Sequence, residues 1–73
     1  MGDLYTNMNR EIDILKHAAL NNYDVVSQFV DESKVMFTVD EKDLPAMKQF
    51  CLDEFGSCEV VEQIGSVMMC RVE

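Results

Sequence analysis

Residues 34–73 follow the pattern of a strand, a helix and a hairpin in succession, with almost no spare residues between them. The side chains of 34–39 alternate between two faces, and one of these faces is strongly apolar, as in a short strand with a buried side. Over 44–55 the apolar residues recur at helical spacing, and Pro45 falls in the first turn, where a helix tolerates proline. This order of elements leaves few folds open to so short a chain.

The residues after this helix predict a β-hairpin. Gly65 and Ser66 divide 58–73 into two short apolar runs, and glycine at the first loop position suits a two-residue type II′ turn. The expected register places Val61 opposite Cys70. The last run is apolar on both faces, and such a strand is more stable in the centre of a sheet than at an exposed edge.

These elements predict an α+β domain in which an N-terminal helical segment precedes a split β-α-β-β unit. The expected sheet is small, antiparallel or mixed, and packed on the helices, with three strands in the order 1-3-2. Phe37 and Phe55 are expected to lie buried between the sheet and the helix. We expect one domain over 1–73, because a chain of 73 residues has room for one small core. The marginal stability of such a core favours dimerisation.

The N-terminal part of the chain is predicted to be helical, with Asp3 or Thr6 as its cap. Its apolar residues form one stripe, which is the face expected to pack: Leu4, Met8, Ile12, Leu15 and Ala19. Asn21 and Asn22 are the expected break in this helix. Residues 24–31 are predicted to continue the helix or to form a second short one, although their β-branched side chains weaken that interpretation.

The three cysteines match neither a C-x-x-C pair nor a zinc site, because six and eleven residues separate them. We therefore expect free thiols, no metal and no cofactor. Cys51 lies on the apolar stripe of the predicted helix, where burial keeps a thiol protonated. The expected hairpin register points Cys58 and Cys70 to opposite sides. His17 has no serine or cysteine at a diagnostic spacing, so we expect a protein that is not an enzyme.

The charge of the chain limits its partners. Fourteen acidic residues against six basic residues give a formal net charge of −8. A surface of this kind repels phosphate backbones and anionic lipids, so direct binding to nucleic acid or to a membrane is not expected. The sequence has neither a signal-peptide pattern nor a membrane-spanning apolar stretch, and with its free thiols this favours a cytoplasmic location.

Two routes to a protein partner follow from this chemistry. Carboxylates can meet a basic surface, and the candidates are Asp31, Glu32, Asp40, Glu41 and Asp43. Apolar side chains of the sheet, among them Met36 and Met69, can meet a partner or a second copy of the chain.

We therefore expect a small, acidic, non-enzymatic inhibitor or regulator that binds a macromolecule with a basic surface. Nucleic-acid-binding proteins carry such surfaces, and small viral antagonists of host defence act in this way. The alternative is a homodimeric regulatory domain that senses a small molecule and resembles, in its topology, half of a ferredoxin-like fold.

Overall fold

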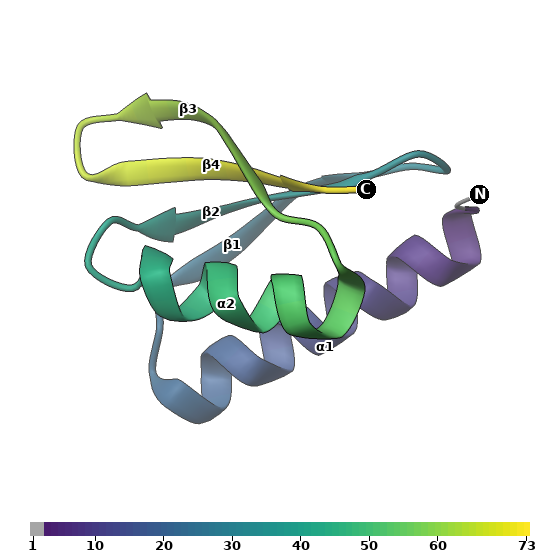
Figure 1. Ribbon diagram of the computed structural model, residues 1–73, viewed down its shortest axis with the longest axis horizontal. Coiled ribbons are helices and arrows are strands. Elements are labelled where there is room, and N and C mark those ends of the chain that lie inside the picture. Colours follow the sequence, from purple (N-terminus) through teal and green to yellow (C-terminus); the bar gives the residue numbers. More distant parts are fainter. Residues whose placement is uncertain (1–2) are drawn as a thin grey trace.

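The computed structural model describes residues 3–73, which form two helices and four strands. Their bounds are α1 Leu4–Asn21, β1 Val25–Val30, β2 Val35–Asp40, α2 Leu44–Phe55, β3 Glu59–Ile64 and β4 Val67–Val72. The strands form one sheet in the order β1-β2-β4-β3, and every neighbouring pair is antiparallel. Both helices lie against the same face of this sheet (Figure 1). The domain is therefore a two-layer α+β structure, which confirms the expected class.

The sheet has four strands, so the prediction of three strands was wrong. The three predicted strands keep their relative order, with β4 between β2 and β3, and β1 is added beside β2. β1 occupies residues for which a second helical piece was expected. A bulge at Gln28 explains this error, because it shifts the register between Ser27 and Phe29. As a result Val26 and Phe29 share one face of the strand although they are three residues apart, a spacing that imitates a helix.

The β3–β4 hairpin has the predicted loop but a different register. Gly65 adopts a positive φ of 61°, as the first loop position of a type II′ turn requires. A bulge at Val61 then pairs Val60, instead of Val61, with Cys70. Val60 therefore packs against the core, whereas Val61 is exposed.

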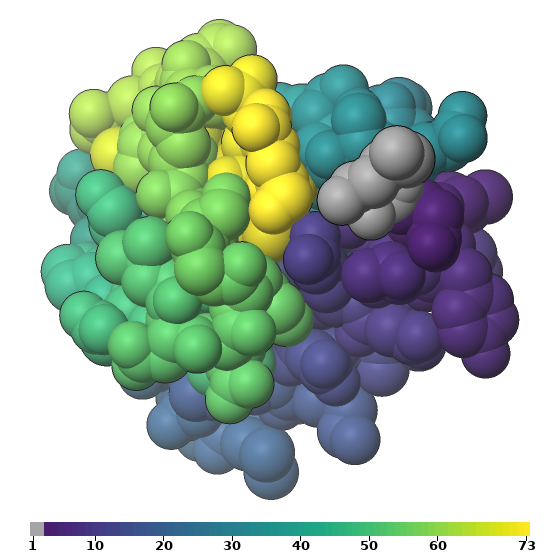
Figure 2. All heavy atoms as spheres, turned by 45° about the vertical axis from the view of Figure 1, so that its right-hand side comes forward, coloured from purple at the N-terminus to yellow at the C-terminus, as the bar shows by residue number. Residues whose placement is uncertain are grey.

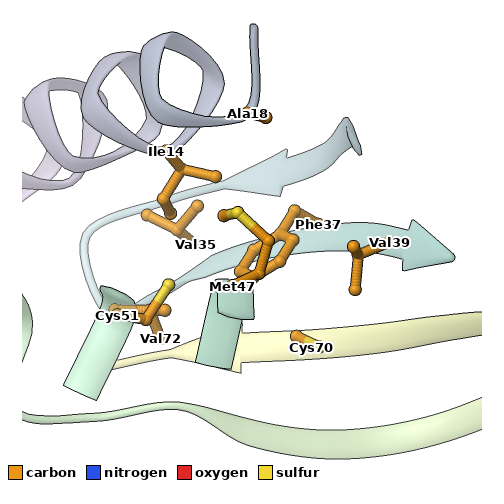
Figure 3. Close-up of a cluster of buried hydrophobic side chains, with 9 residues drawn as sticks. All are labelled: Ile14, Ala18, Val35, Phe37, Val39, Met47, Cys51, Cys70 and Val72. Atoms are coloured by element: carbon orange, nitrogen blue, oxygen red, sulfur yellow. The ribbon is translucent and has the colours of Figure 1, made fainter. Parts of the chain in front are cut away.

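The core fills the space between the sheet and the helices. Figure 3 shows its nine buried apolar side chains: Ile14, Ala18, Val35, Phe37, Val39, Met47, Cys51, Cys70 and Val72. Phe37 lies at the centre of this cluster and is 1% exposed. Phe55, which was expected to be buried as well, is only partly buried. The central strands β2 and β4 thus supply most of the sheet's share of the core.

α1 packs with a different face from the one predicted. Its buried residues are Asn7, Ile14 and Ala18. The residues of the predicted packing stripe are exposed instead: Leu4, Met8, Ile12, Leu15 and Ala19. The start of α1 lies beside the β1–β2 turn (Figure 2), where the Asn7 amide donates a hydrogen bond to the Asp31 carbonyl oxygen at 2.8 Å. This polar contact fixes the rotation of the helix, and an apolar pattern does not reveal it.

The helix ends follow the predicted signals. The Asp3 carboxylate accepts a hydrogen bond from the Thr6 amide at 2.7 Å and so caps the start of α1. Asn22 ends α1 in left-handed geometry with φ 60°, and Gly56 ends α2 with φ 76°. The break expected at Asn21 and Asn22 is therefore confirmed, although a strand follows it.

The β1–β2 turn is held by the carboxylate of Asp31. One of its oxygens accepts hydrogen bonds from the Ser33 amide at 2.8 Å, the Ser33 hydroxyl at 2.9 Å and the Lys34 amide at 2.9 Å. These bonds favour the charged form and lower the pKa of Asp31 below its ordinary value. A lowered folded-state pKa adds stability above the unfolded-state pKa of about 3.9, and this stability is lost as the pH falls through the folded value.

We therefore expect Asp31→Asn to lower the melting temperature near pH 7, and the difference from the unmodified protein to shrink as the pH falls below about 4. Thermal unfolding followed by circular dichroism across this range measures the effect. Glu32→Gln is the matched control, because it removes the same charge from an exposed side chain of the same turn. A difference that stayed constant down to about pH 2 would show that the charge of Asp31 is not the cause.

Candidate protein-binding face

Because both helices cover one face of the sheet, the other face is open (Figure 1). In β2 the residues that point to the core are Val35, Phe37 and Val39, so the residues between them point outward. The register extends this assignment to the other strands. We call the resulting surface the open face, and its side chains are Val26, Phe29, Met36, Thr38, Asp40, Glu59, Glu62, Ile64, Val67, Met69 and Arg71.

Apolar side chains occupy much of the open face. Met36 and Met69 lie near its centre on neighbouring strands, since Met36 pairs with Arg71 and Thr38 pairs with Met69. The apolar side chains around them are 42–63% exposed: Val67, Phe29, Val26 and Ile64. Single exposed apolar residues are common on proteins, but a group that spans all four strands is typical of an interaction surface.

A shallow hollow of about 160 Å³ lies at one end of the open face. It is lined by Asp24, Val26, Thr38, Val39, Asp40 and Val67. Carboxylates from two segments therefore border the apolar side chains of Val26 and Val67. A lysine or arginine side chain suits such a site, because its methylene stem packs on apolar groups while its charge stays beside the carboxylates.

The basic residues at the open face are already paired. The Arg71 guanidinium contacts the Glu59 carboxylate, and its Nε lies 3.1 Å from Oε1 of Glu73. Lys34 lies over the Phe29 ring, 5.3 Å from its centroid, and 3.5 Å from the Asp31 carboxylate. The open-face carboxylates that form no ion pair within the described part of the chain are those of Asp40 and Glu62. The open face is therefore acidic as well as apolar.

The five predicted carboxylates do not form one patch. Asp31 and Glu32 lie in the β1–β2 turn, whereas Asp40, Glu41 and Asp43 lie at the other end of β2. The six residues of β2 separate the two groups by roughly 20 Å, at about 3.3 Å per residue. Only the second group adjoins the hollow, through Asp40.

A second exposed apolar surface lies on α1, where sequence reasoning expected packing. We call it the α1 stripe, and it consists of Leu4, Met8, Ile12 and Leu15, which are 36–51% exposed. The sequence does contain a signal for packing through another face of this helix, because Ile14 and Ala18 form a second apolar face. Periodicity alone does not decide which of two faces packs.

The three cysteines lie together, contrary to the expectation for Cys58 and Cys70. Cys51 and Cys70 are completely buried, and Cys58 is partly buried and packs against the same core. The bulge at Val61 explains the difference, because it turns Val60, and with it Cys58, to the side of Cys70. We call these three thiols the cysteine cluster.

The three thiols shift one another's pKa values. Hydrogen bonding from Cys51 and Cys70 lowers the pKa of Cys58, and the positive charge of Lys48 acts in the same direction. The same contacts, together with burial, raise the pKa values of Cys51 and Cys70. Within residues 3–73, no group of three or more histidine, cysteine or acidic side chains is arranged to hold a metal ion.

His17 packs in the groove between the two helices. Its ring stacks on Phe50 with 4.0 Å between centroids and 10° between planes. The surrounding hollow of about 300 Å³ is also lined by Asp13, Lys16, Leu20 and Glu54. This lining contains no serine or cysteine, so the position of His17 is that of a half-buried helical histidine with an aromatic neighbour.

Comparisons with protein-family models, with curated proteins and with solved structures found no match for this chain. Neither helix in the described range 3–73 is long and apolar enough to cross a membrane.

Proposed function

We propose that this protein is a small non-enzymatic binding module whose open face binds a partner protein with a basic surface. The observation that supports it most is the layering of the fold. Both helices lie on one side of the sheet, so the apolar side chains of the open face, with Met36 and Met69 at its centre, have no layer of the described chain over them. Covering these side chains with a partner removes apolar surface from water and so favours a complex.

The charge of the open face favours a basic partner over a second copy of the chain. Asp40 and Glu62 have no ion-pair partner within the described residues, and the net charge is −8. Two open faces pressed together would bring carboxylates toward one another, whereas lysine and arginine side chains of a partner would complement them. Nucleic-acid-binding proteins present such side chains. In its more specific form, we therefore propose that this protein inhibits or regulates a protein of that class.

The test begins with affinity capture from the native host, followed by purification of the captured protein and calorimetry. We expect Met69→Asp to weaken binding at least about tenfold, because it places a charge among apolar contacts. Leu52→Asp is the matched control and should leave affinity unchanged, since Leu52 is 40% exposed on α2 and lies outside the open face. Circular dichroism checks that each variant is folded.

Two further variants test whether other surfaces take part in partner binding. Reversing the charges of Asp40 and Glu41 to lysine should slow association and reduce its dependence on salt. Ile12→Asp, in the α1 stripe, should have no effect. A partner that is retained by Met69→Asp but lost by Ile12→Asp would contradict the proposal and move the binding surface to α1. Self-association of the purified protein that Met69→Asp abolishes would identify a second copy as the occupant and would also contradict it.

A further inference from the structure

The cysteine cluster joins three separate elements of the fold. Cys51 lies near the end of α2, Cys58 immediately precedes β3, and Cys70 lies in β4. Figure 3 shows Cys51 and Cys70 among the buried side chains between α2 and the sheet, and Cys58 packs against this same group. Three nucleophilic side chains from separate elements thus belong to, or pack against, one buried group.

The three thiols are not equivalent. Cys51 and Cys70 are both 0% exposed, whereas Cys58 is partly open to solvent. Hydrogen bonding from the two buried thiols, followed by the positive charge of Lys48, lowers the pKa of Cys58 and so favours its thiolate. The one thiol of the cluster that a dissolved reagent reaches is therefore also the one that its neighbours stabilise as a nucleophile.

We propose that Cys58 is a peroxide-reactive thiol that forms an intramolecular disulfide with Cys51. In the first step the Cys58 thiolate attacks one oxygen of hydrogen peroxide, the O–O bond breaks, and Cys58 sulfenic acid and hydroxide form. In the second step the Cys51 sulfur attacks the sulfenic sulfur, and the sulfenic oxygen leaves as water with the proton of Cys51. The hydroxide takes up the proton that Cys58 gave up when it ionised. Overall, two thiols lose two electrons and two protons, and one peroxide becomes two waters.

The sheet register favours Cys51 over Cys70 as the second partner. Val60 pairs directly with Cys70, so Cys58 is only a diagonal neighbour of Cys70. Diagonal neighbours in a sheet are roughly 7–8 Å apart, which is longer than the usual Cα separation of about 4.4–6.8 Å in a disulfide. Cys51 lies on the other side of the short connection through Gly56 and Ser57, where the backbone is outside regular structure and can adjust.

The test uses the whole protein, reduced and then treated with hydrogen peroxide. Thiols are counted after unfolding, and the cross-link is mapped by mass spectrometry after cleavage at glutamates. Cleavage after Glu41, Glu54, Glu59 and Glu62 places each cysteine in a different peptide. We expect two thiols to be lost, with Cys51 and Cys58 found in one linked pair of peptides. Cys70→Ala is the matched control and should form the same link.

Two further measurements separate reactivity from simple proximity. Alkylation of Cys58 should change little between about pH 6 and 8, whereas a thiol with a pKa near 8.5 loses about tenfold in rate for each unit below it. In Cys51→Ala, dimedone should trap a sulfenic acid at Cys58. A bridge between Cys58 and Cys70, a bridge between two chains, or alkylation of Cys58 with an ordinary pH dependence would each overturn the proposal.

Discussion

Replacing Phe37 with alanine is expected to lower the free energy of unfolding by about 3–5 kcal/mol. Phe37 lies in the middle of β2, is 1% exposed, and pairs with Ser27 on one neighbouring strand and Cys70 on the other. The cavity left by its ring would be bordered by elements on several sides, which limits how far the core can collapse. Because a core of this size supplies only about 3–5 kcal/mol in total, most molecules of this variant should be unfolded.

Phe29→Ala provides the control for this prediction. It deletes the same side chain from the adjacent strand, but Phe29 is 50% exposed on the open face. We expect a loss of no more than about 1 kcal/mol. Urea unfolding followed by circular dichroism measures both variants. A Phe37→Ala protein as stable as the unmodified one would mean that the buried and open faces of the sheet are assigned the wrong way round.

The second large effect is expected at Asn7, where alanine should cost about 2–4 kcal/mol. Asn7 is 0% exposed, donates to the Asp31 carbonyl oxygen at 2.8 Å and accepts a hydrogen bond from the Arg10 guanidinium at 3.1 Å. Alanine would leave the Asp31 carbonyl without this partner and would also open a small void. The loss should loosen α1 from the β1–β2 turn before the rest of the core opens.

Asn9→Ala is the matched control, because Asn9 is an exposed asparagine on the same helix. Its substitution should change the unfolding free energy by less than about 0.5 kcal/mol. Amide hydrogen exchange shows which part of the structure is loosened, because protection should fall first in α1 and in the β1–β2 turn. If Asn7→Ala and Asn9→Ala behaved alike, the buried amide would be of no consequence for stability.

The sequence predicted those elements whose signals are local. Pro45 and Gly56 mark the two ends of α2, and alternation over 35–39 marks β2. β1 was missed because the bulge at Gln28 breaks the alternation on which strand recognition depends. The packing face of α1 was missed for another reason. Its buried face has a polar residue, Asn7, whose partner lies 24 residues away in the chain.

The same contrast, between local signals and contacts made across the whole fold, applies to the open face and to the cysteine cluster. Alternation within β2 and β4 was enough to identify Met36 and Met69 as sheet residues with an apolar environment. Their position on one open face depends on both helices choosing the opposite face, which is a property of the whole fold. The cysteine cluster escaped prediction because one inserted residue, Val61, reverses which side of β3 the preceding side chains occupy.

The place of β4 in the sheet has a consequence for how this chain folds as it is made. β4 follows every other element along the chain, yet it is the strand that joins the two hairpins, with Val72 paired to Val35. On the ribosome, α1 and the β1–β2 hairpin emerge first, and the inner edge of β2 stays unpaired until Val72 has been released. In the interval between the exit of β2 and the exit of β4, this edge of β2 lacks its partner strand, and an unpaired strand edge is a site on which chaperones can act.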